Sequence, residues 1–99
     1  MEKVALFALL NAKPGKEHEV EKFLKSAQPL AANEPETISW YALKVGPSQF
    51  GIFDTFPHEE GRNAHLTGEI AKALFARAEE LFSTPPKVEK LEILASKTA

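Results

Sequence analysis

The chain contains no cysteine among its 99 residues. Disulfides, thiolate nucleophiles and sulfur-ligated zinc sites are therefore excluded, and cysteine usage says nothing about the redox compartment. No apolar run approaches the roughly 20 residues that a membrane-spanning helix needs. The start, Met1 to Lys3 followed by apolar Val4–Leu10, lacks a credible signal-peptide cleavage site. These absences predict a cytoplasmic protein with no membrane partner.

An excess of positive charge is also lacking. Twelve basic residues stand against fourteen acidic ones, which gives a formal charge of -2, and the two signs are interspersed along the chain. A nucleic-acid partner is therefore not expected. Glycine is sparse, and Gly46, Gly51, Gly61 and Gly68 form no phosphate-binding fingerprint. The sequence therefore implies no nucleotide cofactor.

The composition is otherwise that of a folded domain, with 43% apolar and 26% charged residues. A chain this short holds one hydrophobic core, because two cores would each be too small to offset chain entropy. We therefore expect a single domain over residues 1–99.

The first half of the chain predicts a strand and then a helix. Val4–Leu10 is a short, wholly apolar run, which is typical of a strand buried on both faces. Lys16–Ala32 carries apolar residues at helical spacing and charges on the opposite side, so we expect an amphipathic helix whose last turn is disturbed by Pro29.

Two further strands are predicted on either side of a short turn. Thr37–Val45 is rich in β-branched and aromatic residues, and it is joined to a strand at Gln49–Phe56 by Gly46-Pro47-Ser48. So short a connection predicts an antiparallel hairpin. Because strand side chains alternate, Trp40 and Tyr41 are expected on opposite faces of the sheet.

The last third predicts helices and a final strand. Pro57–Phe82 is helical in pattern and divided near Thr67-Gly68 into a short and a longer helix, and Lys87–Ala95 alternates as a strand. The buried side of the longer helix is expected to comprise Ile70, Leu74, Phe75, Ala78, Leu81 and Phe82.

The order β-α-β-β-α-β predicts an α+β domain of ferredoxin-like topology, with a four-stranded antiparallel sheet and the helices on one face. The other face would then be uncovered. A first strand that is apolar on both sides needs a cover there, and a second copy of the chain is the simplest one. We therefore expect a homodimer.

Three passages make the chain resemble the antibiotic biosynthesis monooxygenase (ABM) domains of the dimeric α/β-barrel superfamily. They are Asn11–Glu17, Asn33–Tyr41, and Asp54-x-Phe56 followed by Asn63-Ala64-His65-Leu66. The resemblance covers essentially the whole chain and implies two subunits packed sheet against sheet, with a small-molecule cavity in each. Many members have Glu-x-Trp where this chain has Asp54-Thr55-Phe56, so the indole often associated with the cavity is missing.

The resemblance implies a monooxygenase that needs no cofactor and acts on a small aromatic or quinol-like substrate. Such chemistry needs an apolar pocket and a base, because a deprotonated phenol or quinol reacts with oxygen itself. His65 is the candidate base and Asn11 the candidate orienting residue. The alternative is structural, since a histidine at a helix end caps carbonyls and an Asn before Pro-Gly makes a turn.

Substrate contacts are predicted for Trp40, Phe53, Phe56 and Arg62. The alternative for the aromatic residues is plain core packing. For Arg62, an ion pair with Asp54 competes with binding of an anionic ligand. A metal site is not expected, because it would need His58, Glu59 or Glu60, and His65 to converge.

Two other functions remain open at this stage. One is haem binding or degradation with His65 as axial ligand, as in one branch of the family, although that branch pairs the histidine with a Trp that is absent at Phe56. The other is a non-enzymatic barrel that binds a small molecule without chemistry, because the fold by itself does not determine function.

Overall fold

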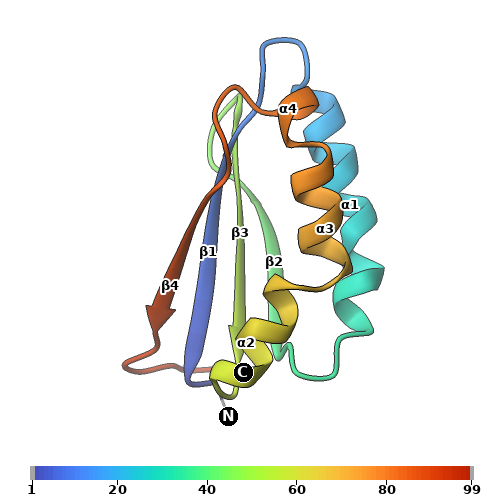
Figure 1. Cartoon of the computed structure of the whole chain (residues 1–99). Coiled ribbons are helices and arrows are strands. Elements are labelled where there is room, and N and C mark those ends of the chain that lie inside the picture. The colour runs from blue at the N-terminus through green and yellow to red at the C-terminus, as the bar shows by residue number, and fades with distance from the viewer. Residues whose placement is uncertain (1, 99) are drawn as a thin grey trace.

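The computed structural model describes residues 2–98 and contains four strands, one long helix and three short ones (Figure 1). The elements in chain order are β1 (Val4–Asn11), α1 (Glu17–Ala32), β2 (Ser39–Lys44), β3 (Gln49–Phe56), α2 (Glu59–Leu66), α3 (Glu69–Ala76), α4 (Ala78–Leu81) and β4 (Lys87–Glu92).

The strands form one sheet in the order β2-β3-β1-β4, and every neighbouring pair is antiparallel. The helices lie together on one side of this sheet (Figure 1). This arrangement confirms the predicted ferredoxin-like βαββαβ fold. Strand pairing places Trp40, Asp54 and Leu6 in one row across β2, β3 and β1, because Asp54 lies opposite both of the other residues.

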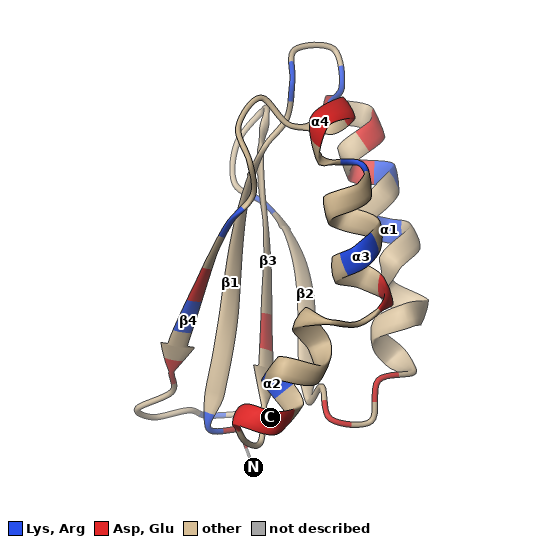
Figure 2. Cartoon of the chain, viewed as in Figure 1, with Lys and Arg blue, Asp and Glu red and all other residues tan. Residues whose placement is uncertain are grey.

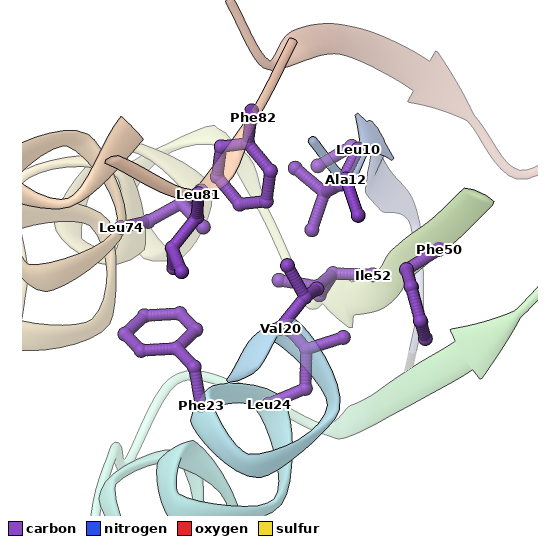
Figure 3. Packing of buried hydrophobic residues seen from close by; sticks show 11 residues of the cluster. Leu10, Ala12, Val20, Phe23, Leu24, Phe50, Ile52, Leu74, Leu81 and Phe82 are labelled. Carbon is purple, nitrogen blue, oxygen red and sulfur yellow. The ribbon is translucent and has the colours of Figure 1, made fainter. Parts of the chain in front are cut away.

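The core lies between the sheet and the helices. Figure 3 shows Val20 and Leu24 of α1 facing Ile52 of β3, with Phe23 and Leu74 closing the helical side. Each of these side chains is almost fully buried, and fully burying such a side chain contributes about 1.5–3 kcal/mol. Apolar residues at helical spacing on α1 and at alternate positions on β3 thus meet in one layer.

The other face of the sheet has no helix over it. The exposed side chains on this face include Tyr41, Leu43 and Leu91. Phe7 of β1 and Phe53 of β3 lie opposite each other on the same face and are half-buried. We call this surface the open face. Trp40 and Tyr41 do lie on opposite faces, as predicted, since Trp40 packs against the core while Tyr41 is exposed.

Several element boundaries differ from those predicted. The last helical segment is broken at Arg77 into α3 and α4, and Phe75 is 53% exposed instead of buried. Strand β4 ends at Glu92, short of the predicted Ala95. The helix α1 continues through Pro29 to Ala32. Within one chain, β1 is fully buried on the helical side from Leu6 to Leu10, whereas on the open face Ala5 is buried and Phe7 and Leu9 keep partial exposure.

Charged residues are concentrated on the helices, the loops and β4, and β1 carries none (Figure 2). Strand β3 carries a single acidic band, which corresponds to Asp54, the only charged residue in that strand. None of the helices within residues 2–98 has the length and apolarity to cross a bilayer.

Candidate functional site

A buried histidine held between two carboxylates forms the most unusual polar group of the molecule. His65 Nδ1 lies 2.7 Å from Glu34 Oε1, and His65 Nε2 lies 2.8 Å from Asp54 Oδ2. His65 is 7% exposed and Asp54 is 1% exposed. We call these three residues the acid–histidine–acid group. Both ring nitrogens are therefore engaged, which fixes the orientation of the ring.

Three separate elements bring this group together. Glu34 lies in the turn after α1, Asp54 near the end of β3, and His65 in the last turn of α2. A close approach between α2 and the loop after α1 makes the contact to Glu34 feasible. A Cβ at Gly61 would lie 2.9 Å from Glu36 Cβ, so only glycine allows this approach. Thr37 Oγ1 also donates to Glu34 Oε1 at 2.7 Å and helps to fix the carboxylate.

The charges of the group depend on one another. Burial raises the pKa of Asp54 above its usual value, and the hydrogen bond from His65 opposes that rise only in part. Burial alone would lower the pKa of His65, but the hydrogen bonds and charges of Asp54 and Glu34 outweigh it and raise that pKa. We therefore describe His65 as an imidazolium that donates from both nitrogens to two carboxylates.

His65 lies between two cavities. On one side is an apolar cavity of about 40 Å³ between the sheet and α3. It is lined by His65, Asp54 and apolar residues, namely Leu6, Ala8, Ile52, Leu66, Ile70, Ala71, Leu74, Phe75 and Val88. On the other side is a larger surface pocket of about 440 Å³, rimmed by Glu34, Glu36 and Glu69. His65 thus lines both an apolar cavity and a pocket with three glutamates in its lining.

Two buried side-chain polar atoms have no hydrogen-bond partner among the described residues. They are Asp54 Oδ1 and Trp40 Nε1. An unpaired buried polar atom costs about 1–3 kcal/mol, so such atoms are uncommon in folded proteins. Asp54 lines the apolar cavity, and its second oxygen already accepts from His65. Asp54 thus lines the cavity and keeps one buried carboxylate oxygen, Oδ1, without a hydrogen-bond partner.

The predicted orienting residue Asn11 lies far from His65. It follows Leu6, the β1 residue opposite Asp54, by five positions, which corresponds to about 17 Å along a strand. Its side chain lies on the open face, where Oδ1 accepts from Gln49 and Nδ2 donates to Thr84. The structure does not bring Asn11 and His65 into one site, because they occupy opposite ends of the sheet.

The three aromatic residues predicted to contact substrate lie in three different places. Phe56 is fully buried, and its ring centroid lies 5.4 Å from that of His65. Trp40 packs on the helical side of the sheet against the cluster of Ala27, Ala31 and Ile70, and it lines a different pocket from the one that Asp54 lines. Phe53 lies on the open face opposite Tyr41 and Phe7. Only Phe56 and Trp40 are therefore placed on the side of the sheet that holds His65.

Arg62 takes a structural position. Its Nη1 donates to the carbonyl oxygens of Ala5 at 3.1 Å and Leu91 at 3.0 Å, which ties α2 to β1 and β4. Its ion pair is with Glu59, one turn earlier on α2. The predicted pair between Arg62 and Asp54 is wrong, because Asp54 is paired with His65 instead.

Sequence reasoning missed Glu34 and the central position of Asp54. The available signal for Asp54 was a lone carboxylate in the otherwise uncharged strand QFGIFDTF. Glu34 gave no signal, because it stands in a polar turn and meets His65 across 31 residues of chain. Within residues 2–98, no three His, Asp or Glu side chains are arranged to hold a metal ion.

The comparisons with known proteins support the fold and one close relationship. No protein-family model matches the chain, and no curated protein matches it. The structure of NE2512, a protein of unknown function from Nitrosomonas europaea, has a TM-score of 0.97 and 56% identity, covering 100% of this chain and 96% of that one.

Other solved structures share the fold at low identity. A protein called "putative antibiotic biosynthesis monooxygenase" from Nitrosomonas europaea has a TM-score of 0.83 at 13% identity, covering 94% of this chain and 91% of that one. One of the same description from Caulobacter crescentus has a TM-score of 0.79 at 21% identity, covering 95% and 92%. These likenesses show the ferredoxin-like fold. At 56% identity over the whole chain, the protein belongs to the same family as NE2512 of Nitrosomonas europaea, for which no function is known.

Proposed function

We propose that this protein is a cofactor-independent monooxygenase of the ABM type that acts on a small phenol or quinol. The observation that carries the proposal is Asp54, which lines an apolar cavity and has a buried carboxylate oxygen, Oδ1, without a hydrogen-bond partner. The shared fold of proteins named for this activity supports it. The raised pKa of Asp54 supports it further, because a desolvated carboxylate is a stronger base than one in water.

Asp54 replaces His65 as the proposed base. His65 has no free ring nitrogen, since Glu34 and Asp54 occupy both. Its role is to keep Asp54 ionised in an apolar environment, because an imidazolium at 2.8 Å compensates the buried charge. Glu34 in turn orients the imidazolium from the other side, as the third member of a catalytic triad orients its histidine.

The proposed reaction balances with O₂ as the only reactant besides the substrate. Asp54 Oδ1 takes the phenolic proton, and the phenolate combines with O₂ at its para carbon. The proton returns from Oδ1 to the peroxide oxygen, the O–O bond breaks, and the para C–H proton leaves with the departing hydroxide as water. One phenol and one O₂ thus give one quinone and one water, and the substrate supplies all four electrons.

The proposal includes a homodimer formed through the open face. Tyr41, Leu43 and Leu91 are exposed there, and an uncovered apolar surface on a sheet is typical of an interface between subunits. A second copy that packs its own open face against the first would bury both. The apolar cavity lies on the opposite side of the sheet, so each subunit would keep its own site.

The experiment that tests the function is oxygen uptake with 1-naphthol, whose para position is free. We expect one O₂ consumed per 1,4-naphthoquinone formed, by protein that has been treated with a chelator. Asp54→Asn, which keeps the size of the side chain, is expected to lower the rate by about 100-fold or more, the usual contribution of a general base. Asn11→Ala, at the far end of the sheet, is expected to keep the rate.

Absence of turnover with phenols and quinols, or full activity in Asp54→Asn, would contradict the proposal. A non-enzymatic small-molecule binder is the second candidate, because the apolar cavity measures only about 40 Å³. Binding of 1-naphthol without oxygen uptake would favour it. The residues present do not fit a haem, since His65 has no free nitrogen for iron.

A further inference from the structure

We infer that the loop 33–38 is a proton-dependent switch, in which Glu34 stays on His65 while the acid–histidine–acid group holds two protons and leaves it when one proton is lost. This loop lines the larger of the two pockets at His65, so its movement changes that pocket. The inference concerns access to His65, and it does not depend on the proposed oxygenation.

The loop 33–38 connects α1 to β2 and lies against α2. Its two ends are fixed by backbone hydrogen bonds to α1 and β3, but among the described residues no backbone hydrogen bond joins it to α2. Two side-chain pairs make that connection, namely Glu34 with His65 and Glu36 with His58. Figure 2 shows the acidic positions of the loop close to α2. Two histidines of one helix thus hold the loop.

His58 makes its contacts without a positive charge. Its Nδ1 accepts from Gly61 N at 3.3 Å, and its Nε2 lies 3.2 Å from Glu36 Oε1. A neutral imidazole has one donor and one acceptor, so the tautomer with its proton on Nε2 makes both contacts. Protonation of Nδ1 would remove the contact to Gly61 and leave the donation from Nε2 in place. The contact between His58 and Glu36 is therefore available in both protonation states.

His65 has a different requirement, because both of its ring nitrogens face carboxylate oxygens. Nδ1 lies 2.7 Å from Glu34 Oε1, and Nε2 lies 2.8 Å from Asp54 Oδ2. Two hydrogen bonds among these three residues need two protons, wherever those protons reside. When only one proton is left, one nitrogen lone pair faces a carboxylate oxygen and repels it. One of the two contacts must then be lost.

The contact to Glu34 is the one that the structure allows to be lost. Asp54 is 1% exposed and lies on β3, which is paired with a strand on either side, so its carboxylate is shielded from bulk water. The side chain of Glu34 is 21% exposed, stands in a turn and lines a pocket of about 440 Å³. A carboxylate released there is hydrated, which compensates the lost contact. Thr37, which donates to Glu34 Oε1, belongs to the same loop and can move with it.

The charged groups around the His65 ring determine the pH at which the switch operates. They are Asp54 of β3, Glu34 and Glu36 of the loop 33–38, Glu69 of α3, and Arg62 of α2, while β1 adds none. Burial lowers the pKa of His65, but the hydrogen bonds and charges of Asp54 and Glu34 outweigh it and raise that pKa. Arg62 bonds to Glu59 and to backbone oxygens instead of the ring. We therefore expect the switch to operate above pH 6.5, the ordinary value for histidine.

Release of Glu34 changes the pocket that gives access to His65. This pocket has residues 33–37 of the loop in its lining, together with Gly61, Ala64 and His65 of α2. His65 also lines the apolar cavity of about 40 Å³. Movement of Glu34 away from the ring therefore uncovers the residue that the two linings share.

The test is ¹H–¹H NOE spectroscopy of the intact protein on both sides of the His65 midpoint, which the titration of its ring protons provides. Cross-peaks between the His65 ring and the Glu34 side chain are expected below the midpoint and should be lost above it. Cross-peaks between the His58 ring and Glu36 are the internal control. They should persist at both pH values, because that contact needs no positive charge.

Two variants of equal size make the assignment specific. A carboxamide accepts from an imidazolium and, turned over, donates to a neutral imidazole. The side chain in Glu34→Gln should therefore stay on His65 on both sides of the midpoint. Glu36→Gln is the matched control from the same loop and should keep the loss of the contact between His65 and Glu34. Far-UV circular dichroism checks folding, and if a variant fails to fold, the NOE measurement on the unmodified protein still decides the question.

Three results would overturn the inference. The cross-peaks between His65 and Glu34 could persist above the midpoint, or they could disappear together with those between His58 and Glu36, which would indicate general loosening of the loop. The His65 ring could also keep its charge throughout the pH range in which the protein is folded. Oxygen uptake from 1-naphthol is measured separately, so failure of the switch would leave the proposed function in place.

Discussion

The two faces of strand β3 differ in how their side chains are buried and in the charge that they carry. Phe50, Ile52, Asp54 and Phe56 alternate on the helical side, where each is at least nine-tenths buried. Phe53 points to the open face, where Tyr41 and Leu43 of the neighbouring strand β2 are exposed. On the helical side a charge is buried and compensated by His65 within the chain. On the open face Tyr41, Leu43 and Leu91 remain exposed in the described part of the chain.

The two faces of the sheet differ in which contacts stabilise them. The helical face is closed by packing and by the acid–histidine–acid group, so its stability depends on internal charge balance. On the open face Ala5 and Thr55 are buried within the chain, but Tyr41, Leu43 and Leu91 stay exposed, so the contribution of these three side chains depends on association. Substitutions on the helical face should therefore change the unfolding free energy, whereas substitutions on the open face should change the oligomeric state.

The largest effect is expected from His65→Ala, which leaves Asp54 and Glu34 without their shared cation. We expect the free energy of unfolding at pH 7 to fall by about 3–5 kcal/mol, the usual cost of removing one partner from a buried ion pair. The loss should shrink as the pH is lowered, because protonation removes the uncompensated charge of Asp54, whose pKa is already raised by burial. Urea denaturation at several pH values measures this.

The matched control for His65→Ala is His58→Ala. His58 caps the start of α2 by accepting from Gly61 N, and it is half-exposed beside Glu36. Its loss should cost about 1 kcal/mol, as for other helix caps. Equal costs for the two variants would show that the buried group contributes no more than an ordinary cap.

A smaller effect, on association alone, is expected from Leu43→Lys on the open face. Leu43 and Leu30 are each 40% exposed, but Leu30 lies on α1 at the helical side. Leu43→Lys should raise the dimer dissociation constant by about 10-fold or more, equal to about 1.4 kcal/mol, because a lysine would be buried in the proposed interface. Leu30→Lys should leave association unchanged. Sedimentation equilibrium measures both, and a monomeric parent protein would remove the proposed dimer.

The smallest effect concerns the titration of His65. We expect the pKa of His65, followed by NMR of its ring protons, to lie above the ordinary value of 6.5. A raised pKa in the folded state means that the stabilisation is complete below pH 6.5 and is lost as the pH rises through the folded pKa. Glu34→Gln removes one of the two charges and should move that pKa down. A His65 pKa below 6.5 would contradict the imidazolium assignment.

Much of the fold could be predicted from local pattern. The apolar alternation of β3 and the helical spacing on α1 predicted both elements with nearly correct boundaries. The spacing of apolar residues reflects which face of a strand or helix is buried. The break at Arg77 and the exposure of Phe75 could not be predicted in this way. Helical spacing shows which residues share a side of a helix, but not where the helix breaks or how deeply each apolar residue on that side is buried.

The candidate site could be predicted only in part. His65 was found as a histidine in the Asn63–Leu66 passage, and Trp40 and Phe56 lie on its side of the sheet. Asn11 was placed with it in error, because both stand in passages of the same resemblance although they lie at opposite ends of the sheet. The sequence shows which residues are present, but it does not show whether two of them lie at the same end of the sheet.

The sequence by itself determined the order of strands and helices, the buried side of most elements and the existence of one uncovered apolar face. Those features follow from local periodicity, which each segment carries alone. Only the tertiary structure decided that Glu34, Asp54 and His65 meet, and that Asp54 Oδ1 and Trp40 Nε1 are left unpaired. Such contacts depend on strand register and on the close approach at Gly61, which join segments distant in the chain.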